Sequence, residues 1–156
     1  MTLDDYLLPS AGLDMGRILS CWAPLIPDGA TVWLANQFGE PFLVYEDGSV
    51  HHFDPEGGAV EQVAESRDDF ISLLGQEDNA NQWFLIPLVE EARAAGMTLG
   101  PGQCYGFAQP TVLGGDYALS NVRVKTMDEY FAFLADLHAQ IRDVPDGAQV
   151  EIEWTD

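Results

Sequence analysis

Apolar and polar positions alternate with different periods along the chain. Near the N-terminus, residues 2–8 and 14–23 carry apolar side chains at helical spacing, and prolines follow both segments. Because proline ends a helix, we expect two short helices there, the first capped by Thr2. From residue 30 the period becomes two. This alternation covers four runs, residues 31–36, 42–46, 49–53 and 59–64.

The four alternating runs predict an antiparallel β-meander with one face exposed to solvent. Turn sequences separate the runs, and the clearest is Asp47-Gly48. This dipeptide favours a tight hairpin in which both turn residues adopt positive φ. The sequence therefore predicts four short strands that pair with their neighbours in chain order.

Helical periodicity returns after the last of these strands. Ser66 is a predicted cap for a helix that ends at Gly75, and residues 76–81 read as a loop. Residues 83–95 are predicted to be helical, with Pro87 either kinking the helix or beginning a second one.

The C-terminal third combines strands with one long helix. Residues 104–107 and 119–124 are predicted strands, and Thr126 to Glu129 form a capping box that begins a helix over 127–141. The apolar residues of this helix form one continuous face. A half-buried strand is expected at 150–154.

The order of these elements predicts the α+β class. We expect an antiparallel β-meander packed against several helices in a single domain over residues 30–156. Residues 1–29 form a short helical N-terminal segment in this interpretation. The length of 156 residues and the 47% apolar content are sufficient for one hydrophobic core.

The acidic charge is the property of the composition that says most about possible partners. The chain carries 26 acidic and six basic residues, for a net charge of −20. Residues 1–65 hold eleven acids and one base, and residues 66–156 hold fifteen acids and five bases. The charge therefore covers the whole fold, which argues against direct binding to nucleic acid or anionic lipid. It favours a cationic partner, although solubility or adaptation to salt would produce the same composition.

Targeting signals are not evident in the sequence. No apolar run reaches the roughly 20 residues of a membrane span, and the chain does not open with a basic and apolar leader. We therefore expect a cytoplasmic protein that does not bind a membrane.

The residues suited to catalysis or metal binding are few. His51 and His52 are adjacent in a predicted strand, so they point to opposite faces and cannot chelate one ion. His138 lies on the apolar face of the last helix and is interpreted as a core residue. Cys21 and Cys104 have no metal-binding spacing and are expected to be buried, reduced thiols.

Two further patterns invite a ligand but lack its signature. The acidic stretch 46–56 does not have the alternating oxygen ligands of a calcium loop. The glycines between residues 100 and 115 are not followed by the lysine of a phosphate-binding loop. We therefore expect no catalytic residue, no cofactor and no metal, and a binding protein rather than an enzyme.

One stretch of the sequence resembles a known family. The run LGPGQCYGFAQPTVLGGDYALSNVRV (99–124), the helix MDEYFAFLADLHAQI (127–141) and the turn VPDG (144–147) resemble the C-terminal domain of bacterial type VI secretion immunity proteins that neutralise DNase effectors. The preceding residues 45–74 resemble the same family, so the likeness covers about 30–147. Its most specific parts are Leu99-Gly100-Pro101-Gly102, Cys104-Tyr105, Pro110 and Leu113-Gly114-Gly115.

The resemblance implies an immunity protein that captures a cognate toxin stoichiometrically and without catalysis. The toxin would be basic, because a nuclease must bind polyanionic DNA. Members of this family often carry a GAD-like domain, and residues 1–29 are too short to form one. This chain is therefore expected either to be a stand-alone member or to arrange its toxin contacts differently.

Acidic turn residues are the candidates for contact with the toxin. The candidate residues are Glu46 and Asp47 at the hairpin tip, Asp54 and Glu56 in the next turn, and Asp116 and Tyr117 after the double glycine. Two other functions remain open. The chain could be an acidic interaction or regulatory module that binds a basic cellular protein, or a small hydrolase whose site no motif marks. Substitution of His51 or Cys104 would test the hydrolase.

Overall fold

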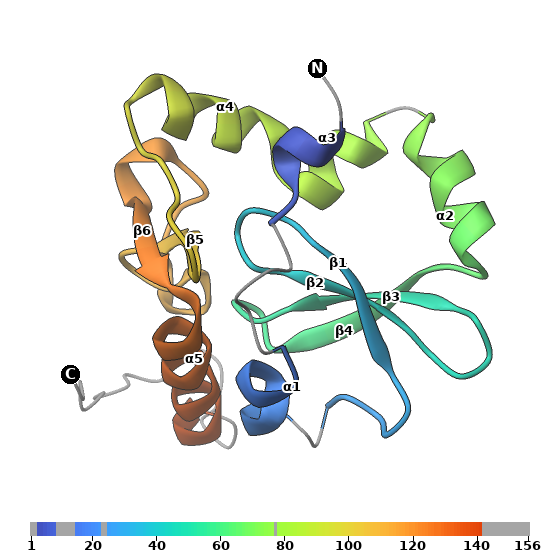
Figure 1. Ribbon diagram of the computed structural model, residues 1–156. Coiled ribbons are helices and arrows are strands. Elements are labelled where there is room, and N and C mark those ends of the chain that lie inside the picture. The colour runs from blue at the N-terminus through green and yellow to red at the C-terminus, as the bar shows by residue number, and fades with distance from the viewer. Residues whose placement is uncertain (1–2, 9–14, 23–24, 77, 142–156) are drawn as a thin grey trace.

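Four antiparallel strands lie at the centre of the computed structural model, which describes residues 3–8, 15–22, 25–76 and 78–141 (Figure 1). In chain order they are β1 (Thr31–Ala35), β2 (Pro41–Val44), β3 (Val50–Asp54) and β4 (Ala59–Ala64), and they pair in the same order. A second sheet consists of β5 (Gln103–Phe107) and β6 (Val122–Thr126). The predicted α+β class and the antiparallel meander are confirmed.

Helices and short 3-10 turns surround the two sheets (Figure 1). The α-helices are α1 (Met15–Ile18), α2 (Arg67–Leu74), α3 (Asn79–Phe84), α4 (Ile86–Ala94) and α5 (Met127–Ile141). The 3-10 turns are η1 (Leu3–Tyr6), η2 (Leu19–Trp22), η3 (Thr111–Leu113) and η4 (Leu119–Asn121). In the part of the chain that the structure describes, no helix is long and apolar enough to cross a membrane.

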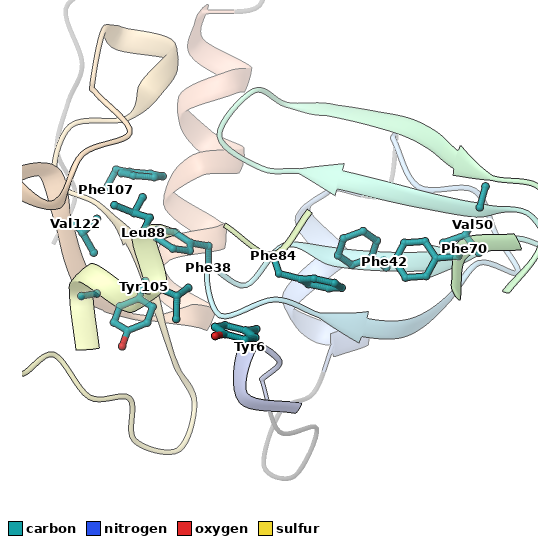
Figure 2. Close-up of a cluster of buried hydrophobic side chains, with 13 residues drawn as sticks. Tyr6, Phe38, Phe42, Val50, Phe70, Phe84, Leu88, Tyr105, Phe107 and Val122 are labelled. Atoms are coloured by element: carbon teal, nitrogen blue, oxygen red, sulfur yellow. The ribbon is translucent and has the colours of Figure 1, made fainter. Parts of the chain in front are cut away.

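Both faces of the four-stranded sheet are covered, so the expected solvent-exposed face is wrong. On one face, Phe42 packs against Phe70 of α2 and Phe84 of α3, with ring centroids 5.2 and 5.5 Å apart (Figure 2). On the other face, Phe53 packs against Phe131 of α5. Because all five rings are fully buried, truncating any one of them to alanine is expected to cost about 3–5 kcal/mol.

The hairpin between β2 and β3 forms, but with a different turn from the predicted one. Gly48 has a φ of +87°, whereas no described residue other than glycine and Leu85 has a positive φ, so Asp47 does not. The Gly48 N–H donates to the Tyr45 carbonyl at 2.9 Å, and the Tyr45 N–H donates to the Ser49 carbonyl at 3.0 Å. This is a three-residue loop in which only the glycine needs the left-handed conformation.

The segment predicted to be helical over 83–95 is divided between two helices. Helix α3 begins at Asn79, inside the predicted loop 76–81, and its Asn79 side chain donates to the Leu73 carbonyl at 2.8 Å. Leu85 then adopts a φ of +51° and separates α3 from α4, which carries Pro87 in its first turn. The second of the two interpretations of Pro87 is therefore correct.

Other boundaries follow the sequence more closely. Ser66 caps α2 as predicted, because its hydroxyl accepts a hydrogen bond from the Asp69 N–H at 3.0 Å. The predicted strand at 119–124 begins only at Val122, after the turn η4. The predicted strand at 150–154, the turn at 144–147 and the cap at Thr2 lie outside the described residues.

The N-terminal segment covers one edge of the main sheet. Leu7 forms a bridge with Asn36, and the Leu8 N–H donates to the Ala35 carbonyl at 2.9 Å. The first predicted N-terminal helix is the short turn η1, and the second consists of α1 followed by η2. Residues of this segment enter the hydrophobic core, among them Tyr6 and Trp22.

Candidate functional site

Four of the six predicted contact residues lie at opposite ends of β3, and the other two lie in the loop between β5 and β6. Glu46 and Asp47 are at the hairpin tip before β3, whereas Asp54 ends β3 and Glu56 follows in the β3–β4 turn. A five-residue strand extends over about 13 Å, at about 3.3 Å per residue. These four acids therefore do not form one patch, and Asp54 and Glu56 instead neighbour the loop that carries Asp116 and Tyr117.

The hairpin tip presents two exposed carboxylates, Glu46 and Asp47. The Asp47 carboxylate accepts hydrogen bonds from the Ser49 hydroxyl at 2.5 Å and from the Ser49 N–H at 2.9 Å. These bonds stabilise the charged form, and they lower the pKa of Asp47. The tip is therefore an ordered turn that keeps its negative charge.

Next to this turn, Ser49 and His51 place a hydroxyl beside an imidazole. The Ser49 Oγ lies 2.9 Å from His51 Nε2, and the same hydroxyl donates to Asp47. In a catalytic triad the acid binds the second nitrogen of the histidine and orients it, whereas here both groups meet at one hydroxyl. His51 also stacks on Tyr45, with centroids 3.5 Å apart. The three polar groups support the turn and do not form a nucleophile–base–acid series.

Glu56 is in the interior, which corrects its prediction as a surface contact. Its side chain is 2% exposed. One carboxylate oxygen accepts the Tyr130 hydroxyl of α5, and the other accepts the Thr111 N–H at 3.0 Å. Burial raises the pKa of Glu56 to about 7, although the bonds from Thr111 oppose that rise. The residue therefore links the β3–β4 turn to α5 and to the loop after β5.

A second buried acid, Glu40, lies close to Glu56 and Asp54. Glu40 binds His52 Nε2 at 3.0 Å and the Asn36 side-chain amide at 2.8 Å. Burial lowers the pKa of His52, but the hydrogen bond and charge of Glu40 outweigh it and raise the pKa overall. The pKa of Asp54 is raised by its own burial and then by the charge of Glu40. Three carboxyl groups, those of Glu40, Asp54 and Glu56, therefore lie close together beneath the loop after β5.

The loop between β5 and β6, residues 108–121, is held in shape by side chains. Asn121 accepts the Gln109 N–H at 2.9 Å and donates to the carbonyls of Gln109 and Asp116 at 3.0 Å each. The Gln109 amide in turn donates to the Leu113 carbonyl at 2.8 Å. These bonds order the backbone before any partner arrives, which lowers the entropic cost of binding.

The double glycine of this loop has a steric role. Gly114 has a φ of +92°, a conformation that glycine adopts without strain. A Cβ on Gly115 would lie 1.9 Å from the Gln109 carbonyl oxygen, so only glycine fits there. The loop closes tightly on itself because both positions lack a side chain.

The β5–β6 loop exposes two apolar side chains. Tyr117 is 53% exposed and Val112 is 41% exposed. The Tyr117 ring packs edge-on against Phe107, with ring centroids 5.0 Å apart. Asp116 is exposed beside Tyr117. An ordered aromatic residue next to an acid has the character of an interface contact.

The remaining chemically reactive side chains are those of the two cysteines and His138. Cys104 is buried and its pKa is raised to about 12 by burial, as expected of a core thiol, whereas Cys21 is exposed, contrary to prediction. Both are free cysteines. His138 Nε2 lies 3.1 and 3.0 Å from the carbonyls of Pro55 and Glu56, so the half-buried imidazole contacts the β3–β4 turn. Within the described ranges, no three His, Cys, Asp or Glu side chains are arranged to hold a metal ion.

Sequence reasoning missed several residues that build this region. Glu40, Thr111, Val112 and Tyr130 were not identified as site residues. The spacing of Pro110 and Gly114 marks a tight turn, and this signal could have identified Thr111 and Val112, which lie in that turn. The burial of Glu40 and Tyr130 depends on long-range packing and has no local signal.

Comparison with known proteins adds one family. Residues 64–138 match the family model described as T6SS immunity protein Tdi1, C-terminal. No curated protein matches the chain. The matched residues run from the end of β4 into α5 and include the whole β5–β6 loop, whereas strands β1 to β3 precede them. The predicted family is confirmed over this segment, which is shorter than the expected 30–147.

Proposed function

Because residues 64–138 match the family model of a type VI secretion system immunity protein, we propose that this chain binds and neutralises a cognate secreted nuclease toxin. Capture is stoichiometric and non-catalytic: one folded partner covers a surface of the other. The family match is the observation that carries the proposal. The protein acts in the cytoplasm of the cell that it protects, where a DNA-cutting toxin would meet its substrate.

The charge of the chain supports a nuclease as the target. A nuclease presents a basic face to the DNA backbone, and a protein of net charge −20 is attracted to that face. Complementary charge increases the association rate, which matters for a toxin that must be bound before it cuts DNA. The same charge repels nucleic acid, so the chain competes with DNA and does not bind it.

The β5–β6 loop is the contact surface that we favour. It lies within the segment that matches the family and presents Tyr117, Val112 and Asp116 on an ordered backbone. An aromatic side chain at the centre of an interface contributes more to affinity than peripheral charges do. Asp54, half-buried beneath the loop, adds negative charge next to Tyr117.

The hairpin tip is the alternative contact surface. Because it lies at the other end of the sheet, variants can distinguish the two surfaces. Tyr117→Ala and Asp116→Lys alter the loop, and Glu46→Lys with Asp47→Lys alters the tip. Glu56 is unsuitable for charge reversal, because a lysine at this buried position would disrupt folding.

The test is co-expression with the product of the adjacent reading frame, followed by purification and a DNA-cleavage assay. We expect an equimolar complex that does not cleave DNA and an association rate that falls as salt increases. Loop variants should dissociate faster, while tip variants leave dissociation unchanged. A neighbouring product without nuclease activity would favour the alternative, an acidic module for a basic cellular protein.

A further inference from the structure

We propose that the outer edge of β4 binds an extended, basic segment of the partner by β-strand addition. This inference rests on the proposed function, because the segment belongs to the nuclease toxin. It concerns the main sheet and is separate from the β5–β6 loop. The observation behind it is a difference between the two edges of the four-stranded sheet.

One edge strand of this sheet is covered, whereas the other is not. β1 is covered by the chain itself, through the Leu7–Asn36 bridge and the bond from the Leu8 N–H to the Ala35 carbonyl. β4 is the last strand in the order, and among the described residues no strand or bridge pairs with its outer side. An uncovered edge presents backbone groups that can pair with another chain.

The register identifies the backbone groups that face outward. The bond between the Tyr45 N–H and the Ser49 carbonyl makes this pair a hydrogen-bonded one, and bonded pairs alternate along an antiparallel ladder. His51 therefore bonds toward β2 and His52 toward β4, where it faces Glu61. Val60 and Gln62 flank Glu61, and they direct their N–H and C=O groups away from the sheet.

The chemistry of this edge favours a basic segment over a second copy of the chain. Glu61 and Glu65 are exposed along it, and a pocket of about 500 Å³ at its end is lined by residues that include Glu65 and Asp69. Two copies pairing edge to edge would bring these carboxylates together, with a net charge of −20 on each chain. A lysine or arginine of an incoming strand would instead place its charge against Glu65 and Asp69.

Hydrogen exchange at single amides tests the proposal directly. In the free chain, the Val60 and Gln62 amides should exchange about 100-fold faster than the Glu61 amide, which bonds to β3. In the complex with the product of the adjacent reading frame, both should slow by about 100-fold. Gln62→Pro removes one outward N–H and should weaken binding about 10-fold, while Gln62→Thr keeps the N–H and should bind normally.

The outcomes separate this inference from the proposed function. If the complex forms and the Val60 and Gln62 amides exchange as before, strand addition is wrong and the immunity function stands. If these amides are already protected in the free chain, a second copy or the chain's own segment 150–154 occupies the edge, and the inference is overturned; dependence on protein concentration identifies the copy. If no complex forms, the proposed function and this inference both fail.

Discussion

The buried carboxyl of Glu56 makes the stability of this protein depend on pH in a predictable direction. Glu56 is 2% exposed and accepts bonds from Tyr130 and Thr111, so its charged form is desolvated but not isolated. We consider the substitution Glu56→Gln, which removes the titrating group and nearly preserves its shape. The nearby ionisable side chains of Glu40, His52 and Asp54 remain in the variant.

The size of this pH dependence follows from the difference between the pKa of Glu56 in the folded protein and its pKa in the unfolded chain. The pKa of Glu56 is about 7 in the folded protein and 4.5 as its ordinary value. Between these values the folded state holds a proton that the unfolded state has lost, so protonation stabilises the fold at low pH. That stabilisation disappears as the pH rises through 7. At about 1.4 kcal/mol per pH unit it amounts to about 3 kcal/mol in total, of which about 2.5 kcal/mol falls between pH 5 and pH 8.

Urea unfolding at pH 5, 6, 7 and 8 measures this contribution. The free energy of unfolding of the wild type, relative to Glu56→Gln, should fall by about 2.5 kcal/mol from pH 5 to pH 8. Glu46→Gln removes the same charge from the exposed hairpin tip and controls for the change in net charge. A wild-type-minus-variant difference that stays constant across this range would refute the reasoning that burial dominates at Glu56.

Three further substitutions test the loop and the core. Tyr117→Ala should raise the Kd for the partner, measured by titration calorimetry, by about 10-fold or more without lowering the Tm in thermal melts. The control Ile71→Ala, at another exposed position, should change neither the Kd nor the Tm. Gly115→Ala should lower Tm because its Cβ meets a backbone carbonyl at 1.9 Å, whereas Gly75→Ala, with 3.6 Å of clearance, should be neutral; equal melting points would contradict the steric argument. Phe131→Ala should reduce the free energy of unfolding by about 3–5 kcal/mol, and a loss below 1 kcal/mol would exclude it from the core.

Much of the fold could be predicted because local patterns and packing agree. The four strands and the long helix α5 follow directly from periodicity, and the start of α2 follows from its Ser66 cap. The start of α3 at Asn79 could not be predicted, because the polar residues before Trp83 carry no apolar period. The covered second face of the sheet depends on α5 and the N-terminal helices meeting it, which is a long-range contact that local periodicity does not report.

The candidate site was less predictable than the fold. Exposure of Glu46, Asp47, Asp116 and Tyr117 agrees with their positions in turns. Glu56 also lies in a turn, and its burial arises from α5 and the β5–β6 loop closing over it, which a count of turn acids cannot reveal. Sequence reasoning therefore locates turns reliably, but it does not show which turns the rest of the chain covers.

The most direct test of the immunity function is inhibition of DNA cleavage at defined stoichiometry. The product of the adjacent reading frame is incubated with plasmid DNA and increasing amounts of this protein, and cleavage is followed over time. We expect cleavage to stop at one equivalent and the amount of protein needed to rise as salt increases. Full cleavage in the presence of a several-fold excess, with both proteins folded, would contradict it.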